Sequence, residues 1–153
     1  MLTYTGFVES KAGLIKITAD NIGINEIAFV EQPNVEPHEN GIVEQAKSQL
    51  SDYLARKRQQ FDLPLNPRGT DFQKQVWRLL VDIPFGNTAS YQDIALKLGD
   101  KNKVRAVGGA NGKNPIAIVV PCHRVIGKNG TLTGYAGGLE RKAFLLDIEN
   151  IVH

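Results

Sequence analysis

A single cysteine, placed between a proline and two basic residues, is the residue of this sequence best suited to chemistry. Cys122 follows Pro121 and precedes His123 and Arg124. A thiol becomes a strong nucleophile where a base or a cation favours its thiolate. The ordinary alternative is a buried cysteine that packs as a small apolar residue. The pattern therefore indicates a Cys–His nucleophile, and a hydrolase that works by acyl transfer is one open interpretation.

The segments on either side of this cysteine predict how it is positioned. The apolar run over residues 116–120 predicts a buried strand that ends at the cysteine. Successive side chains of an extended chain point to opposite sides, so His123 needs a bend or a bridging water to reach the thiol. Residues 139–148 predict a closing helix.

Two short helices are predicted upstream of the cysteine. Ser90 is a good N-cap for a helix over residues 91–98, Gly99 provides a turn, and residues 103–110 predict a second helix. This arrangement matches a helix-turn-helix, although two packed helices also serve as plain scaffold.

The second of these helices contains two adjacent glycines, Gly108 and Gly109. Each costs about 1 kcal/mol of helix propensity relative to alanine. Either tight helix packing or a partner that approaches the backbone would explain them. The nearby Lys101, Lys103 and Arg105 favour a phosphate backbone as that partner.

The N-terminal part of the chain predicts a small β-sheet covered by a helix. Strand patterns occur over residues 4–9, 14–19 and 23–30, and apolar residues recur at helical spacing between residues 42 and 54. Helix breakers cluster near Pro67, after which a further helix is expected to begin at Thr70 or Asp71 and to end by Pro84.

The charge balance changes at the same place. Residues 1–66 carry six Lys and Arg against nine Asp and Glu, a net charge of −3, whereas residues 67–153 carry twelve against seven, a net charge of +5. We therefore expect an α+β (α/β) protein with an N-terminal domain over residues 1–66 and a basic C-terminal domain over residues 67–153. A basic excess of this size permits binding to a polyanion without proving it.

Composition excludes several classes of protein. The chain of 153 residues is 42% hydrophobic and 22% charged, and its apolar runs are far shorter than the ~20 residues of a membrane span. The first ten residues lack a secretory signal, so we expect a cytoplasmic protein that binds no membrane. One cysteine and three scattered histidines offer neither an internal disulfide nor zinc-ligand spacing, so no metal or other cofactor is expected.

Four segments together resemble a known protein family. They are Pro121-Cys122-His123-Arg124-Val125, Arg105-Ala106-Val107-Gly108-Gly109-Ala110, Asn114-Pro115 and Gly134-Tyr135-Ala136-Gly137-Gly138. They are similar to those of the O6-alkylguanine-DNA alkyltransferases, also called methylated-DNA–protein-cysteine methyltransferases. The resemblance is close over residues 71–150. It implies a ribonuclease H-like N-terminal domain and a mostly helical C-terminal domain of the winged helix-turn-helix type.

The resemblance implies roles for five residues in catalysis. Cys122 would accept the alkyl group, and His123 would deprotonate it through a water. Glu149 would orient the imidazole, although a solvated carboxylate is the plain alternative for this residue. Asn114 would tie the recognition helix to the active-site segment. Tyr91 would rotate the target phosphate and protonate the departing guanine.

Further positions would form the substrate pocket and the DNA-binding surface. Tyr135 would stack on the flipped base, and backbone groups of Val125, Ala136 and Gly137 would line the pocket. The residues expected on DNA are Arg105, which would fill the space of the extruded nucleotide, with Lys103, Ala106, Gly109 and Ala110. Two positions depart from the family pattern: Ala136 stands where serine is frequent, and Asn111 replaces a more usual apolar residue.

The implied function is DNA repair by irreversible transfer of an alkyl group from O6-alkylguanine to Cys122, once per molecule, after base flipping. The implied partner is double-stranded DNA, bound in the minor groove by a monomer with little sequence preference. The alternative is a DNA-binding protein that senses alkyl lesions without accepting the alkyl group. The sequence leaves open the preferred alkyl size, activity on O4-alkylthymine, cooperative assembly on DNA and the role of the N-terminal domain.

Overall fold

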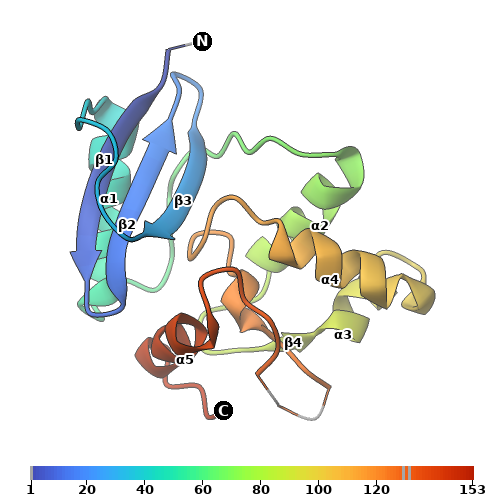
Figure 1. The fold of residues 1–153 in the computed structure, drawn as a ribbon. Helices are drawn as coiled ribbons and strands as arrows, with labels where there is room; N and C mark the ends of the chain where they lie inside the picture. The colour runs from blue at the N-terminus through green and yellow to red at the C-terminus, as the bar shows by residue number, and fades with distance from the viewer. Residues whose placement is uncertain (1, 129, 131) are drawn as a thin grey trace. The chain divides into compact units, whose positions relative to one another are not determined.

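Three strands and one helix form the N-terminal half of the computed structural model, which describes residues 2–128, 130 and 132–153. The chain divides into two units, the first ending at Arg68 and the second beginning at Gly69. In the first unit, strands β1 (Tyr4–Ser10), β2 (Gly13–Ala19) and β3 (Ile24–Val30) pair antiparallel in that order. Helix α1 (Gly41–Leu54) follows them. The predicted sheet with a covering helix is confirmed (Figure 1).

Helix α1 packs on the sheet face that alternation along the strands makes apolar. Ile15 and Ile17 are fully buried, as are Val43 and Leu50 of the helix. Gly6 allows close approach, because a Cβ atom there would lie 2.7 Å from a methyl carbon of Val43. The first unit therefore has its own hydrophobic core.

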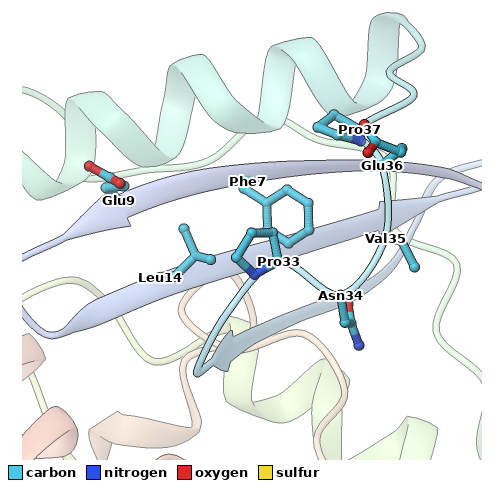
Figure 2. Close-up of a pocket in the computed structure, with 8 residues that line it drawn as sticks. All are labelled: Phe7, Glu9, Leu14, Pro33, Asn34, Val35, Glu36 and Pro37. Carbon is cyan, nitrogen blue, oxygen red and sulfur yellow. The ribbon is translucent and has the colours of Figure 1, made fainter.

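An open hollow of about 730 Å³ lies within the first unit. Phe7 and Leu14 alternate with the residues that face α1, so they line the other side of the sheet. Figure 2 shows Pro33 and the segment up to Pro37 beside the Phe7 ring. The described lining residues carry apolar, amide and carboxylate groups and include no cysteine, histidine, lysine or hydroxyl side chain.

The second unit is mostly helical. Its helices are α2 (Asp71–Val81), α3 (Tyr91–Lys97), α4 (Val104–Gly112) and α5 (Leu139–Ile148), with 3-10 turns η1 (Lys101–Lys103) and η2 (Cys122–Arg124). Two short strands, β4 (Ala89–Ser90) and β5 (Val125–Ile126), pair in parallel. The predicted fold class is confirmed, with a sheet and covering helix in one unit and a helical second unit.

The helix starts follow from local sequence. The hydroxyls of Thr70 and Ser90 accept hydrogen bonds from the backbone N–H groups of Gln73 and Asp93, and both sites form complete capping boxes. Gly99 ends the turn after α3 with a φ of +90°, a conformation that favours glycine. Helices α3 and α4 therefore form the predicted two-helix pair. None of the helices in the described part of the chain has the length and hydropathy to span a bilayer.

The predicted strand over residues 116–120 is wrong. The segment is buried, but it folds as consecutive turns in which the N–H of Val119 bonds to the carbonyl of Ala117 and that of Val120 to Ile116. Ile118 has a φ of +72°, which no strand allows. Apolar character alone does not separate a buried strand from a buried turn, and here side-chain hydrogen bonds from Asn114 replace the strand ladder.

Candidate active site

Cys122 begins the 3-10 turn η2 and is 5% exposed. Pro121 precedes it with a φ of −82° and a ψ of 63°, which turns the chain into η2. Burial raises the pKa of the Cys122 thiol, while a hydrogen bond from the Asn114 side chain and the positive charge of Lys142 act in the opposite direction. The sequence predicted that a bend or a bridging water is needed for His123 to reach the thiol. The 3-10 turn η2, which contains both residues, provides such a bend.

His123 and Glu149 form a fully buried hydrogen bond of 2.6 Å between Nε2 and Oε2. A carboxylate only accepts hydrogen bonds, so Nε2 carries the hydrogen and Nδ1 keeps its lone pair. Nδ1 has no hydrogen-bond partner among the described residues. Burial lowers the pKa of His123, and with the charges of Arg124 and Lys142 it outweighs the raising effect of Glu149, so the ring is neutral at physiological pH and can accept a proton at Nδ1.

Glu149 is not the solvated carboxylate that its place near the chain end suggested. It directly follows α5 and is 2% exposed. The backbone N–H of Gly86 donates to Oε1 at 3.1 Å, and Arg124 contacts both carboxylate oxygens. The plain alternative considered for Glu149 is therefore wrong.

Asn114 organises the buried turn that leads to the cysteine. Its side-chain amide donates to the carbonyl oxygens of Val120 at 2.9 Å and of Ile116 at 3.3 Å, and its Oδ1 accepts from the N–H of Ile116 at 3.0 Å. Asn114 lies two residues after α4, so it connects that helix with the segment carrying Cys122.

The loop before α5 is held from two sides. Lys142, fully buried, donates to the carbonyl oxygens of Val125 at 2.6 Å and Thr133 at 3.1 Å. The Thr133 hydroxyl lies 2.7 Å from the hydroxyl of Tyr91, the first residue of α3. Lys142 and Thr133 thus link β5, this loop and the start of α3.

Tyr135 belongs to the same loop and is electrostatically coupled to Cys122. Burial raises the pKa of Tyr135 well above its ordinary value, and the thiolate charge of Cys122 adds to that rise. The Tyr135 hydroxyl has no hydrogen-bond partner among the described residues. Ala136 is exposed, and the carbonyl of Gly137 accepts a hydrogen bond from Arg141 at 3.4 Å.

The residues expected on DNA occupy two environments. Lys103, Arg105, Ala106 and Gly109 are exposed. Ala110 is 3% exposed, and its carbonyl accepts a hydrogen bond of 2.8 Å from the indole N–H of Trp77. Four of the five therefore lie on the open side of the α4 segment, while Ala110 lies where α4 packs on α2.

The two glycines of α4 also differ in their surroundings. A Cβ atom on Gly109 would meet no described atom within 4 Å, and one on Gly108 would lie 3.9 Å from the Tyr91 ring. Tight packing within the described part of the chain does not explain Gly109. The open helix surface at this point leaves space for a partner.

Two family models match this chain. The model of the 6-O-methylguanine DNA methyltransferase DNA-binding domain covers residues 71–151, and the model of the ribonuclease-like domain of the same enzymes covers residues 3–67. The chain belongs to the 6-O-methylguanine DNA methyltransferase family. The resemblance seen in the sequence is confirmed by these matches.

Relatives within the 6-O-methylguanine DNA methyltransferase family align over nearly the whole chain. The methylated-DNA–protein-cysteine methyltransferase of Methanosarcina barkeri is 44% identical over 152 residues, which cover 95% of this chain and 96% of that protein. The crystal structure of Mycobacterium tuberculosis O6-methylguanine methyltransferase has a TM-score of 0.87 and 41% identity, covering 97% of this chain and 93% of that one. The Mycobacterium tuberculosis OGT in complex with DNA has a TM-score of 0.85 and 43% identity, covering 94% and 90%.

Two charged residues for which the sequence predicted no role, Arg124 and Lys142, are buried beside the site. Arg124 is 5% exposed and Lys142 is 0% exposed. Burial of an arginine and a lysine is unusual unless their charges are compensated. Lys142 lies on the same side of the predicted closing helix as its apolar residues, and this position was the sequence signal that could have indicated its burial. Among the described residues, no three or more His, Cys, Asp or Glu side chains gather in a cluster that could hold a metal ion.

Proposed function

We propose that this protein repairs DNA by transferring the alkyl group of O6-alkylguanine to the sulfur of Cys122, once per molecule. The observation that carries the proposal is the buried arrangement of Cys122, His123 and Glu149, in which Nδ1 of a neutral imidazole is free to accept a proton. Relatives that align with nearly the whole chain are named methylated-DNA–protein-cysteine methyltransferases, which supports the same chemistry here.

The reaction is a displacement at a saturated carbon. The thiol proton of Cys122 passes through a water to Nδ1 of His123, and Glu149 stabilises the imidazolium that forms. The sulfur then bonds to the alkyl carbon while the bond from that carbon to O6 of guanine breaks. The guanine anion takes a proton from the hydroxyl of Tyr91, which first gives up its hydrogen bond with Thr133. Tyr91 then recovers a proton from solvent and the imidazolium of His123 releases one, so the proton of the thiol ends, in net terms, on guanine. None of the described groups around Cys122 could break the carbon–sulfur bond of the thioether product, so the transfer is irreversible.

The target base must leave the duplex, because its O6 substituent is stacked within the helix where the thiol cannot align for attack. Arg105 fills the space that the flipped nucleotide leaves, and Lys103 contacts phosphates. Small residues at Ala106 and Gly109, on the open side of α4, allow the helix to enter the minor groove, whereas the expected contact of Ala110 with DNA is replaced by its packing against α2. Phosphate contacts carry no sequence information, so a single copy of the protein binds DNA with little sequence preference.

The flipped base occupies a pocket formed by the loop before α5. The ring of Tyr135 stacks on the base, and backbone groups of Val125, Ala136 and Gly137 face its edge. Ala136 provides no hydroxyl for O6, which leaves room for larger alkyl groups. In this proposal residues 67–153 bind DNA and accept the alkyl group, and residues 1–66 support them.

Intact-mass measurement tests the proposal. The reduced protein is incubated with a duplex that contains O6-methylguanine, and its mass and modified peptide are determined. A single methyl group on Cys122 is the expected result. Binding without a mass change would instead support a lesion sensor. Hydrolysis of an ester probe by Cys122, without methyl transfer, would support a hydrolase.

A further inference from the structure

The buried charges beside His123 form a compact ion pair. Arg124 donates from Nε to Oε1 of Glu149 at 2.8 Å and from Nη2 to Oε2 at 3.1 Å. Its Nη1 donates to the carbonyl oxygen of Ile83 at 2.6 Å, and the guanidinium lies 5.9 Å from the centre of the Phe85 ring. Arg124 is thus held at three nitrogens, and its charge is permanent at any physiological pH.

The charges in this cluster determine the protonation state of the imidazole. Arg124 neutralises Glu149, so the buried pair carries no net charge and the neutral ring of His123 adds none. If Arg124 lost its charge, Glu149 would remain as a buried anion that keeps the neutral N–H of Gly86 and the His123 ring, 2.6 Å away, among its partners. A buried anion without a counter-charge is costly, so the ring would tend to take a proton and become imidazolium. Imidazolium carries hydrogen on both nitrogens and cannot accept the thiol proton.

We propose that Arg124 is a positioning residue for the proton transfer: by neutralising Glu149 it keeps His123 as the neutral ring with hydrogen on Nε2 and a free lone pair on Nδ1. The inference rests on the proposed function, because it assigns His123 the task of accepting the proton of Cys122. It adds a role for the fourth residue of the motif that begins at Pro121.

A second cation, Lys142, also lowers the pKa of His123 through its charge. Its ammonium donates hydrogen bonds to the carbonyl oxygens of Val125 and Thr133, whereas Arg124 donates to the carboxylate of Glu149 itself. Two further titratable groups lie nearby: Cys122 directly precedes His123 in η2, and the Tyr135 hydroxyl interacts electrostatically with Cys122. The charge of Arg124 lowers the pKa of His123 and the charge of Glu149 raises it, so an experiment can separate the effects of these two residues.

The test compares Arg124→Met, Glu149→Gln and the double variant. Methyl transfer from an O6-methylguanine duplex is measured under single-turnover conditions from acidic to alkaline buffer, and the acid limb of the profile reports the protonation of His123. Arg124→Met should move that limb to higher pH by at least about one unit, since a neighbouring charge shifts a pKa by about 1–3 units. Glu149→Gln should move it to lower pH, and the double variant should return it toward the wild-type position.

Ring ¹⁵N resonances of His123 provide a readout that does not depend on activity. In Arg124→Met the ring should be imidazolium at neutral pH, whereas in the wild type and the double variant it should be neutral. Arg124→Lys keeps the charge and should keep the acid limb near the wild-type position. Arg78→Met removes an exposed arginine of α2 and serves as the matched control, with no shift expected.

Several results would overturn the inference. Equal losses of rate at every pH without a shift would assign Arg124 a structural role only, as would a neutral His123 ring in Arg124→Met. If Arg124→Met does not fold, Glu149→Gln and the charge-balanced double variant decide, and an unshifted limb in Glu149→Gln contradicts the inference. Wild-type protein that transfers no methyl group would overturn the proposed function instead, while the ¹⁵N spectra would still decide the role of Arg124.

Discussion

Each unit buries one carboxylate among the described residues, and the two are held in different ways. Asp20, in the first unit, accepts hydrogen bonds from the backbone N–H groups of Ile22 and Gly23 and from the side-chain amides of Asn25 and Asn66. Glu149, in the second unit, is bound by a histidine and an arginine.

The difference separates a structural carboxylate from one that the proposed function assigns to proton transfer. Hydrogen bonds from the Asn25 side chain and the Gly23 backbone hold the pKa of Asp20 well below its ordinary range, and none of its donors changes protonation near neutral pH. Asp20 therefore joins the β2–β3 turn to the end of the first unit, near Asn66. Glu149 contacts His123, and histidine is the side chain whose ordinary pKa lies near neutrality, so the charge of Glu149 can influence whether the imidazole holds a proton.

Replacing His123 should have the largest effect on activity. His123→Ala removes the group that accepts the thiol proton, and loss of general-base assistance typically lowers a rate by about 10²–10⁴-fold. Single-turnover transfer from an O6-methylguanine duplex measures the change. The matched control is His153→Ala, since His153 lies near the chain end and bonds to the exposed Asp147. Full activity of His123→Ala would refute the assigned role.

Replacing Lys142 should reduce both stability and thiol reactivity. Lys142→Met leaves the carbonyl oxygens of Val125 and Thr133 without their buried donor, which should cost about 1–3 kcal/mol of unfolding free energy. The pKa of Cys122 should also rise, because the charge of Lys142 lowers it. Urea unfolding and the pH dependence of Cys122 alkylation by a small reagent measure the two effects. Lys97→Met, on an exposed position of α3, should change neither.

Replacing Asp20 should reduce stability and leave the chemistry unchanged. Asp20→Asn removes an ionised acceptor whose pKa is lowered in the folded protein, so the wild-type advantage is present above the unfolded pKa of about 4. That advantage should shrink as the pH falls toward the folded pKa. Unfolding curves at neutral and acidic pH measure it. A loss of methyl transfer by fully folded Asp20→Asn protein would contradict the division of roles between the two carboxylates.

The smallest expected effect on stability has the opposite sign. Gly109→Ala adds a Cβ atom in open space on α4 and should stabilise the protein by about 0.5–1 kcal/mol, because alanine is the better helix former. It should also weaken DNA binding, since the added methyl group blocks close approach to the backbone. Thermal unfolding and titration with duplex DNA measure the two changes. Unchanged DNA affinity would exclude Gly109 from the binding surface.

Local sequence signals predicted most of the elements that position the site. The helix starts at Thr70 and Ser90, the two-helix pair and the closing helix all follow from caps, turns and periodicity, which depend on neighbouring residues. The segment over residues 116–120 was predicted wrongly for the same reason. Its apolar pattern is local, but the hydrogen bonds that shape it come from the Asn114 side chain.

The amino-acid sequence by itself determined the family and predicted the nucleophile and its histidine, because these are carried by adjacent residues around Cys122 and by the Arg105–Ala110 segment. Only the tertiary structure decided that Glu149 is buried beside His123, that Arg124 contacts both of its carboxylate oxygens and that Lys142 holds the loop before α5. His123 and Glu149 are 26 residues apart in the chain. The charge of a buried group depends on which distant partners the folded chain brings to it, and no periodic pattern of the sequence records that.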